Sequence, residues 1–294
     1  MDHSHNYRPR RSCLYMPGAN TRALEKAATL PADTLILDLE DAVTPDDKAS
    51  ARQAVQDTVA SRPYGYREVI IRINGLDTPW GQDDLAMAAC SGADGILVPK
   101  IVAGHQVTEL DTALTQAGAP KGLELWVMIE MPLAILNIQE IAATATASRL
   151  SGLAMGTNDL AKEMNARTTP DRAAFQQALA VTILAAKAYG LVALDGVYND
   201  FKNEPGLIAE CEQGRILGFD GKTLIHPAQL AATNRAFSPE PAELIAAQAI
   251  ITAFELPENE GQGVIKVDGK MVELLHLEEA KRLVAIDAAQ RAQE

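Results

Sequence analysis

Eight short apolar segments, separated by segments with helical spacing, constrain the fold of this chain more than any other feature. The predicted strands cover residues 12–16, 34–37, 69–73, 95–98, 124–129, 150–155, 191–194 and 223–225. The predicted helices cover residues 20–29, 46–61, 82–91, 104–117, 133–147, 171–189, 204–217 and 228–236. Eight successive strand–helix units are typical of an α/β fold of the (β/α)8 TIM-barrel type. An open doubly wound sheet is the competing architecture, but no GxGxxG motif follows the first strand.

Composition agrees with helices packed on a sheet and argues against several classes of protein. Hydrophobic residues make up 47% of the 294 residues, enough for one large core, and aromatic residues make up 4%. The formal net charge of −13 argues against a nucleic-acid partner. The cysteines are widely spaced and form no CxxC motif. Neither a secretory h-region nor an apolar run of membrane-spanning length occurs, so we expect a soluble, cytoplasmic protein.

The alternation of strands and helices stops near residue 238, and a segment of different organisation follows. A helix is predicted at residues 242–254, and a β-hairpin at residues 264–267 and 271–275 with Asp268 and Gly269 as its turn. A final helix is predicted at residues 277–292. Because an isolated hairpin is marginally stable in water, this segment must pack on something. We therefore expect a catalytic barrel at residues 1–237. Residues 238–294 then form a lid or oligomerisation segment, over their own barrel mouth or that of a neighbouring subunit.

Charged side chains lie at the ends of the second to the eighth predicted strand or directly after them. Glu40 and Asp41 follow the second strand. The later strands are followed, in order, by Arg72, Lys100, Glu130, Asp159, Asp195 and His226. In a (β/α)8 barrel the catalytic residues lie at the carboxyl ends of the strands. The sequence therefore predicts an active site at this edge of the barrel.

Glu130 and Asp159 follow two neighbouring strands, so a βαβ unit brings their carboxylates to the same edge of the sheet. Gly156 beside them lets the backbone approach closely. Mg²⁺ is commonly held by one or two protein carboxylates, and water and substrate oxygens fill its other positions. We predict a magnesium site here, where the metal would polarise a carbonyl oxygen and stabilise an enolate or alkoxide. The alternative is that Glu130 caps a helix or faces solvent.

Three cationic or titratable residues at the same edge have two interpretations each. Arg72 suits a bidentate clamp for the carboxylate of a 2-oxo acid, or else it is a structural partner of Glu40 or Asp41. Lys100 is a candidate Schiff-base lysine, but its acidic neighbours favour an ordinary ion-pair partner. His226 precedes Pro227 and is not assigned as a base, because it could simply cap the eighth helix.

Short motifs spread over nearly the whole chain resemble the citrate lyase beta subunit family. This family belongs to the HpcH/HpaI aldolase group, which includes malyl-CoA and citramalyl-CoA lyases. The motifs are RSCLYMPG (11–18), ILDLEDAV (36–43), IRIN (71–74), VPK (98–100), IEMP (129–132), GTNDL (156–160), IHPAQ (225–229) and DGKM (268–271). Each motif is short, but their combined order is specific.

The resemblance implies a Mg²⁺-dependent TIM barrel that forms homotrimers or hexamers. It places the metal ligands at Glu130 and Asp159 and the clamp for the oxo acid at Arg72. It places the rest of the acid pocket at the backbone of Gly156, Thr157 and Asn158. The implied reaction is cleavage of a 3-hydroxyacyl-CoA into an acyl-CoA and a 2-oxo acid, or the reverse condensation. Glu40 and Asp41 are kept as further catalytic candidates.

Two positions depart from the pattern of the family. Many CoA lyases carry an aspartate in the tail, which reaches the site of a neighbouring subunit as the base, where this chain has Glu273. The longer side chain makes Glu273 either a base in a reshaped site or an ordinary solvated residue, since a displacement of about 1 Å can cost on the order of 100-fold. Many relatives also have an acidic residue directly before the metal aspartate, where this chain has Asn158.

A CoA thioester would need a cationic patch on this acidic protein. Arg22 and Lys26 are one helical turn apart and share a face. We assign Arg22, Lys26 and Lys48 to CoA binding. Further candidates for the patch are Arg8, Arg10, Arg11 and Arg52. The alternative is a solvated basic face without a ligand.

The favoured function is thus a Mg²⁺-dependent carbon–carbon lyase with a CoA thioester and a small 2-oxo acid as partners. An aldolase acting on free hydroxy-oxo acids is the alternative within enzymes. A paralogue that binds CoA esters without catalysis, or a subunit of a larger citrate lyase assembly, is the alternative outside stand-alone enzymes. The sequence leaves open the identity of the two substrates and whether the thioester is also hydrolysed.

Overall fold

The structure is a computed structural model that describes residues 7–293. Within it the chain divides into two compact units. The first, residues 10–237, is the barrel unit. The second, the tail unit, combines residues 238–293 with residues 7–9.

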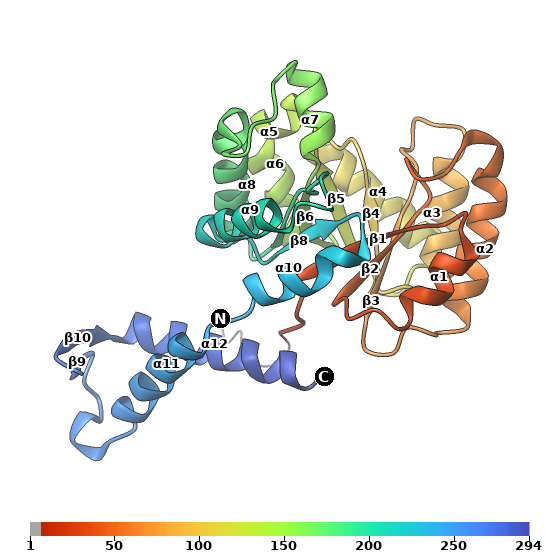
Figure 1. The fold of residues 1–294 in the computed structure, drawn as a ribbon. Coiled ribbons are helices and arrows are strands. Elements are labelled where there is room, and N and C mark those ends of the chain that lie inside the picture. Colours follow the sequence, from red (N-terminus) through yellow and green to blue (C-terminus); the bar gives the residue numbers. More distant parts are fainter. Residues whose placement is uncertain (1–6, 294) are drawn as a thin grey trace. The chain divides into compact units, whose positions relative to one another are not determined.

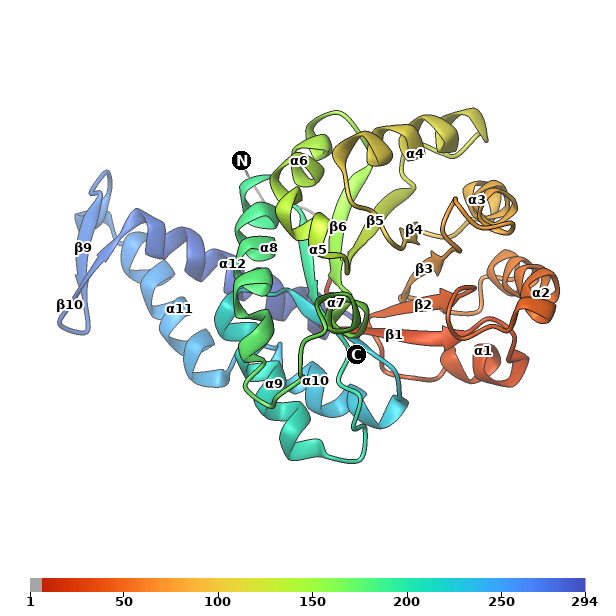
Figure 2. The same ribbon diagram turned by 90° about the horizontal axis from the view of Figure 1, so that it is seen from above.

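The barrel unit is a closed ring of eight parallel strands, as the alternation of apolar segments predicts (Figures 1 and 2). Each strand pairs with the next, and β8 closes the ring on β1. The strands are β1 Ser12–Pro17, β2 Thr34–Asp38, β3 Glu68–Arg72, β4 Gly95–Val98, β5 Glu124–Ile129, β6 Leu150–Met155, β7 Val192–Asp195 and β8 Gly221–Leu224. The predicted TIM barrel is confirmed.

Helices surround this ring of strands (Figure 2). They are α1 Thr21–Ala27, α2 Lys48–Ala60, α3 Gly81–Cys90, α4 Gly104–Gln116, α5 Pro132–Leu136, α6 Ile138–Ala143, α7 Thr157–Met164, α8 Gln176–Ala188, α9 Glu204–Leu217 and α10 Leu230–Ala236. Short 3-10 turns are η1 Pro45–Asp47, η2 Thr144–Thr146, η3 Ala173–Phe175 and η4 Pro227–Gln229. The helices pack on the outer faces of the strands and bury a continuous apolar layer.

Two helical features differ from the prediction. The single helix expected at residues 133–147 is interrupted at Asn137, whose side-chain amide donates to the carbonyl of Val102 at 2.8 Å. The backbone of Asn137 leaves helical geometry at this point, with φ −100° and ψ 12°, so α5 and α6 are separate. The helix α7 was not predicted, since it is short and begins directly after β6. It ends at Asn165, which adopts a left-handed conformation with φ 52°.

The interior of the ring is filled by a separate, smaller apolar cluster. Its buried members are Cys13, Ile36, Ile70, Leu97, Trp126, Met128, Ala154 and Leu194. They alternate along the strands with residues that face the helices, as inward-facing side chains of a (β/α)8 barrel do. The barrel is therefore a packed core, and chemistry is confined to its ends.

Charged residues close the end of the barrel at which the strands begin. Arg10 donates to Glu68 at 2.8 Å and to Glu124 at 2.9 Å, and its guanidinium lies 5.2 Å from the Trp126 ring. Arg11 pairs with Asp33 at 2.8 Å. The prediction that Arg10 and Arg11 extend a CoA-binding patch is therefore wrong, because both guanidinium groups are committed to carboxylates at the end opposite the predicted site.

The tail unit contains α11 Pro241–Phe254, η5 Pro257–Asn259, β9 Val264–Val267, β10 Lys270–Glu273 and α12 Leu274–Arg291. The predicted hairpin and final helix are confirmed. Asp268 and Gly269 form the turn with φ values of 47° and 81°, as a tight two-residue hairpin turn requires. The hairpin buries Ile265 and Val272. In the described part of the chain, no helix has the length and apolar content needed to span a membrane.

Candidate functional site

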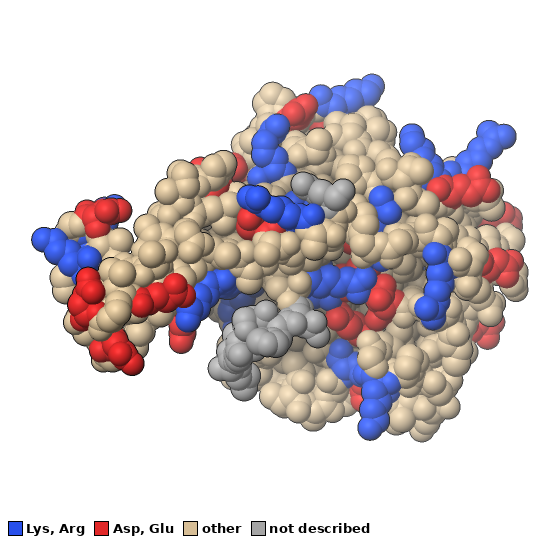
Figure 3. All heavy atoms as spheres, turned by 90° about the horizontal axis from the view of Figure 1, so that it is seen from below, with Lys and Arg blue, Asp and Glu red and all other residues tan. Residues whose placement is uncertain are grey.

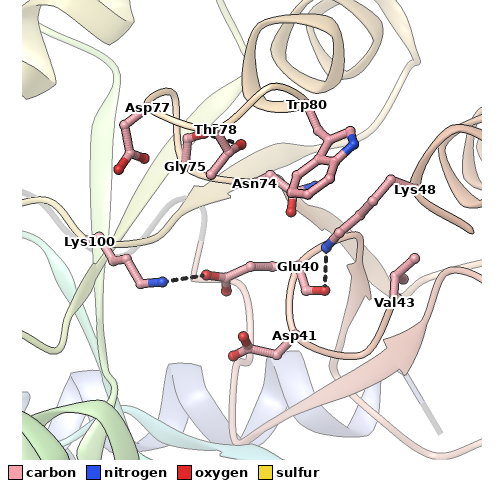
Figure 4. Close-up of a pocket in the computed structure, with 10 residues that line it drawn as sticks. All are labelled: Glu40, Asp41, Val43, Lys48, Asn74, Gly75, Asp77, Thr78, Trp80 and Lys100. Carbon is pink, nitrogen blue, oxygen red and sulfur yellow. Dashed lines mark hydrogen bonds and ion pairs between the residues drawn. The ribbon is translucent and has the colours of Figure 1, made fainter. Parts of the chain in front are cut away.

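A pocket of about 310 Å³ opens where the loops after β2, β3 and β4 meet (Figure 4). It is lined by Glu40, Asp41, Val43, Lys48, Asn74, Gly75, Asp77, Thr78, Trp80 and Lys100. Three of the predicted rim residues, Glu40, Asp41 and Lys100, are among them. In Figure 4, Lys100 points toward the Glu40 carboxylate, and Lys48 reaches a backbone oxygen beside it.

Arg72, the last residue of β3, is buried beside this pocket and is held by acids. Its Nε and Nη2 atoms both donate to Asp38 at 2.7 Å, which makes a bidentate pair. Its Nη1 atom lies 2.8 Å from Glu40 Oε2 and 3.4 Å from Asp41 Oδ2. Arg72 is therefore an ion-pair partner of Glu40 and Asp41, as the alternative interpretation states, and its role toward a substrate stays a prediction. Sequence reasoning missed Asp38, although its alternation within β2 could have placed it inside the barrel.

The loop that carries Glu40 is fixed through its backbone. The buried Lys48 ammonium donates to the carbonyls of Leu39 at 2.8 Å and Glu40 at 2.7 Å. The side-chain amide of Asn74 donates to the carbonyl of Leu39 at 2.8 Å. Burial lowers the pKa of Lys48, and the negative charge of Asp38 opposes that change. These contacts hold the Glu40 side chain over the carboxyl ends of β2 and β3.

Glu40 itself is buried and incompletely satisfied. Its Oε2 atom accepts no hydrogen bond within the described residues, because the approach of Arg72 Nη1 is an ion pair without hydrogen-bond geometry. Burial raises the pKa of Glu40 to about 7, although the positive charge of Arg72 opposes the shift. An acid with this pKa exchanges protons readily near neutral pH.

Glu130, which follows β5, is 2% exposed. Its Oε1 atom accepts the backbone N–H of Lys100 at 2.7 Å, and Lys100 adopts φ 56° to present it. Burial raises the pKa of Glu130 to about 7, and the negative charges of Glu40 and Asp159 add to the shift. A buried carboxylate whose pKa is raised by neighbouring negative charges is stabilised by a cation.

These observations fit a divalent cation bound by Glu130 and Asp159. A Cβ atom added to Gly156 would lie 2.6 Å from Glu130 Oε2, so glycine leaves the space that the carboxylate occupies. Asp159 lies in the first turn of α7, at the end of a neighbouring strand. No group of three or more Asp, Glu, His or Cys side chains within residues 7–293 is arranged to hold a metal. Mg²⁺ commonly takes only one or two protein carboxylates.

Lys100 behaves as an ion-pair partner. Its ammonium lies 3.6 Å from Glu40 Oε1. Burial alone would lower its pKa, but Glu40 and Glu130 outweigh burial and raise the pKa. A Schiff-base lysine needs a lowered pKa, so the ion-pair interpretation is the better one.

Gly156, Thr157 and Asn158, the residues predicted to complete the acid pocket, lie at the amino end of α7. Asn158 and Asn199 form a reciprocal pair, with Asn199 donating at 2.7 Å and Asn158 donating at 3.2 Å. Thr157 packs closely on Gly196: a Cβ atom added to Gly196 would lie 2.6 Å from Thr157 Oγ1. The loop after β7 is thus fixed against the start of α7.

Two other predicted rim residues are placed differently from Glu130. Asp195, in β7, is fully buried and is bound by Arg172 at 2.7 Å and by Lys222 at 3.0 Å. Adjacent strand residues face opposite sides, and since Leu194 faces the barrel interior, Asp195 faces the helices. Its placement in the active-site rim is therefore wrong. His226 Nδ1 accepts the backbone N–H of Ala228 at 3.1 Å, so His226 caps η4.

The residues assigned to CoA binding differ in their exposure to solvent. Arg22 and Lys26 are exposed on α1. Lys48 is buried, and its ammonium holds the loop after β2 instead of facing solvent. Arg52 pairs with Asp84 at 2.6 Å, so it does not extend the patch. On the face shown in Figure 3, basic and acidic side chains are interspersed.

Glu273 belongs to the tail unit. It is exposed at the end of β10 and forms the N-cap of α12, where its backbone N–H donates to His276 Nδ1 at 3.0 Å. Its proposed role as a base stays a prediction.

Comparison with known proteins shows which family and which solved structures this chain is similar to. The model of the HpcH/HpaI aldolase/citrate lyase family matches residues 11–227. A (3S)-malyl-CoA thioesterase of Cereibacter sphaeroides is 51% identical, over 96% of each chain. The citrate lyase subunit beta of Leuconostoc mesenteroides is 34% identical, over 96% of this chain and 94% of its own length. The protein CitE of Mycobacterium tuberculosis, solved with magnesium, acetoacetate and coenzyme A, is 28% identical with a TM-score of 0.74, over 94% of this chain and 97% of that one.

Proposed function

Because the chain belongs to the HpcH/HpaI aldolase/citrate lyase family, we propose that it is a Mg²⁺-dependent enzyme that acts on the CoA thioester of a 3-hydroxy acid. We propose hydrolysis of a malyl-CoA-type thioester as its main reaction. The observation that carries this proposal is the acid cluster of buried Glu130 and Glu40 with half-buried Asp159, beside Arg72. The 51% identity to a malyl-CoA thioesterase supports the choice of bond.

Glu130 and Asp159 would hold the magnesium ion, which supplies Lewis-acid polarisation of a substrate oxygen. Asp38 occupies the Nε–Nη2 edge of the Arg72 guanidinium and leaves Nη1 on the side of Glu40 and Asp41. A substrate carboxylate would therefore bind Arg72 through Nη1, and the bidentate pair with Asp38 would set the orientation of the guanidinium.

Glu40 is the base that the barrel unit itself provides. Its pKa of about 7 allows it to take a proton from water while the water oxygen adds to the thioester carbonyl carbon. The carbon–sulfur bond then breaks, and CoA departs as its thiol with the proton that Glu40 took from the water. This route uses only residues of the barrel unit. The departure from the lyase pattern at Glu273 is consistent with it.

Carbon–carbon cleavage is the second candidate, and the arrangement of Arg72 near Glu130 favours it. This arrangement suits a 2-oxo acid whose carboxylate binds Arg72, as the resemblance to CoA lyases implies. In that reaction Glu273 would act as the base from the tail of a neighbouring subunit in a homotrimer or hexamer.

The two reactions differ in their products. We would incubate the purified chain with (3S)-malyl-CoA and Mg²⁺ and measure free CoA thiol, acetyl-CoA and glyoxylate. Hydrolysis releases free thiol with malate, whereas cleavage releases acetyl-CoA and glyoxylate in equal amounts. If glyoxylate and acetyl-CoA are the main products, the proposed hydrolysis is wrong and the protein is a lyase. Turnover of free 4-hydroxy-2-oxo acids alone would favour an aldolase, and binding without any product would favour a silent paralogue.

A further inference from the structure

Two aromatic rings stack on each other at the carboxyl ends of β7 and β8. Phe201 lies in the loop between β7 and α9, and His226 follows β8 directly. Their ring centroids are 4.3 Å apart, with an angle of 18° between the planes. The carboxyl ends of all eight parallel strands lie at one end of the barrel, so this pair shares its end with the acid cluster.

The pair is fixed in place by buried polar contacts. Gln229 is fully buried, and its Oε1 atom accepts the backbone N–H groups of Ile225 and His226 at 3.1 Å. Its Nε2 atom donates to the carbonyl of Tyr198 at 2.8 Å, which ties the loop after β8 to the loop after β7. The backbone N–H of Phe201 donates to Asn199, the partner of Asn158. Phe201 is therefore held by both loops rather than by an apolar core.

Despite this anchoring, the pair presents apolar surface to solvent. Phe201 is 39% exposed, and the neighbouring Ile225 is 41% exposed. A ring that is rigidly positioned and still exposed loses little conformational entropy when a flat ligand stacks on it. Such rings bind nucleobases independently of hydrogen bonding, because every base has a π-face.

Cationic side chains lie around the same part of the rim. The Lys202 ammonium is 5.9 Å from the centroid of Phe201. β8 pairs with β1, and the helix that follows β1 at this end of the barrel, α1, carries the exposed Arg22 and Lys26. Ammonium and guanidinium groups beside an aromatic face suit a nucleotide, whose base stacks while its phosphates meet the cations.

We propose that the Phe201–His226 pair is the stacking platform for the adenine base of the CoA thioester. This inference rests on the proposed function, since it names the part of the protein that holds the nucleotide end of the proposed substrate. The acyl end would lie at the acid cluster. The competing explanation is that the rings only pack two loops together.

The test uses adenosine 3′,5′-bisphosphate, which is the nucleotide end of CoA without the thioester arm, and measures its binding by calorimetry. Phe201→Ala should weaken binding about tenfold, and Phe201→Tyr should retain it because the ring remains. Tyr66→Ala is the matched control, since Tyr66 is also 39% exposed and also lies beside a cation, Arg67, but precedes β3 at the opposite end of the barrel. Tyr66→Ala should leave binding unchanged.

Turnover gives a second measurement. With malyl-CoA, Phe201→Ala should raise KM about tenfold at constant kcat, whereas a malyl thioester of pantetheine alone should show no change. A lower melting temperature with unchanged binding of the bisphosphate would overturn the platform and leave only loop packing. An equal rise in the KM of Phe201→Ala for the CoA and the pantetheine thioester would also overturn the platform. If the bisphosphate binds through Phe201 but no thioester is turned over, the proposed function fails and the platform stands.

Discussion

At the scale of single residues, the site contains two buried acids, Glu40 and Glu130, that burial keeps from ionising fully at neutral pH. Glu40 and Glu130 both have pKa values raised to about 7, chiefly by burial. Each lies near other carboxylates, so removing water from the site increases their mutual repulsion. This arrangement favours a bound cation.

Magnesium affinity should therefore depend on pH. Since the pKa of Glu130 rises from its ordinary value of 4.5 to about 7 in the folded protein, the metal must displace a proton at pH 6 but not at pH 8. We expect Mg²⁺ binding, measured by calorimetry, to strengthen about tenfold or more between these values. Glu130→Gln should abolish both the binding and its pH dependence. Glu109→Gln, an exposed acid on α4, is the control.

The same shift has a consequence for stability without metal. The folded state binds more protons than the unfolded state between pH 4.5 and about 7, because the folded pKa of Glu130 is the higher one. Its contribution therefore makes the metal-free protein less stable as pH rises through this window. Saturating Mg²⁺ should remove this loss of stability. A melting temperature of the metal-free protein that rises between pH 4.5 and about 7 would contradict this account.

Arg72 should not tolerate replacement by lysine. Arg72→Lys keeps the charge but cannot form the bidentate pair with Asp38, so the cation is no longer held in one orientation. We expect kcat/KM for the thioester to fall about 100-fold, on the scale expected for misplacing a substrate-orienting group. The melting temperature should fall only slightly. Steady-state kinetics with circular dichroism would check both, and unchanged kinetics would remove Arg72 from the site.

At the scale of elements, close contact between α7 and the strand ends sets the geometry of the metal site. Gly156→Ala places a Cβ atom 2.6 Å from Glu130 Oε2 and even closer to the Glu130 Cβ, so Glu130 or α7 must move. We expect Mg²⁺ affinity to fall at least tenfold and unfolding to become easier by about 1–3 kcal/mol. Gly122→Ala is the matched control, because nothing lies within 4 Å of its added Cβ atom. Calorimetry and thermal melts measure the two effects, and equal behaviour of the two variants would refute the contact.

Element prediction from sequence worked where periodicity was strong and failed where a side chain acted locally. The eight strands were found because they are apolar and bounded by polar residues. The break at Asn137 leaves the helical spacing of apolar residues unchanged, so periodicity did not reveal it. Asp195 was assigned to the rim because its position after an apolar run resembles that of Glu130. Its orientation depends on which strand residues face inward.

At the scale of the whole molecule, the two ends of the barrel have different tasks. The end where the strands begin is closed by Arg10, Glu68 and Glu124, a set of charges that satisfy one another. The opposite end keeps acids near a pocket. This division separates stability from chemistry, as is usual for (β/α)8 barrels.

Arg10→Ala should therefore affect stability far more than catalysis. It removes the cation that faces the fully buried Glu68, and loss of one partner of a buried ion pair costs on the order of 3–5 kcal/mol. Urea denaturation should show this loss, while kcat per folded molecule stays near the wild-type value. Arg235→Ala, which removes an exposed ion pair at 3.9 Å, should change stability by less than about 1 kcal/mol. A large fall in kcat for Arg10→Ala would contradict the separation of the two ends.

The sequence by itself determined the order of strands and helices, the TIM barrel and the family, because apolar periodicity and short motifs are local properties of the chain. It also singled out Glu130, Asp159 and Arg72 by their positions after strands. Only the tertiary structure decided that Asp38 holds Arg72, that Lys48 is buried and that Arg10 closes the far end of the barrel. These facts depend on distances between residues far apart in the chain, which are fixed only when the ring of strands closes.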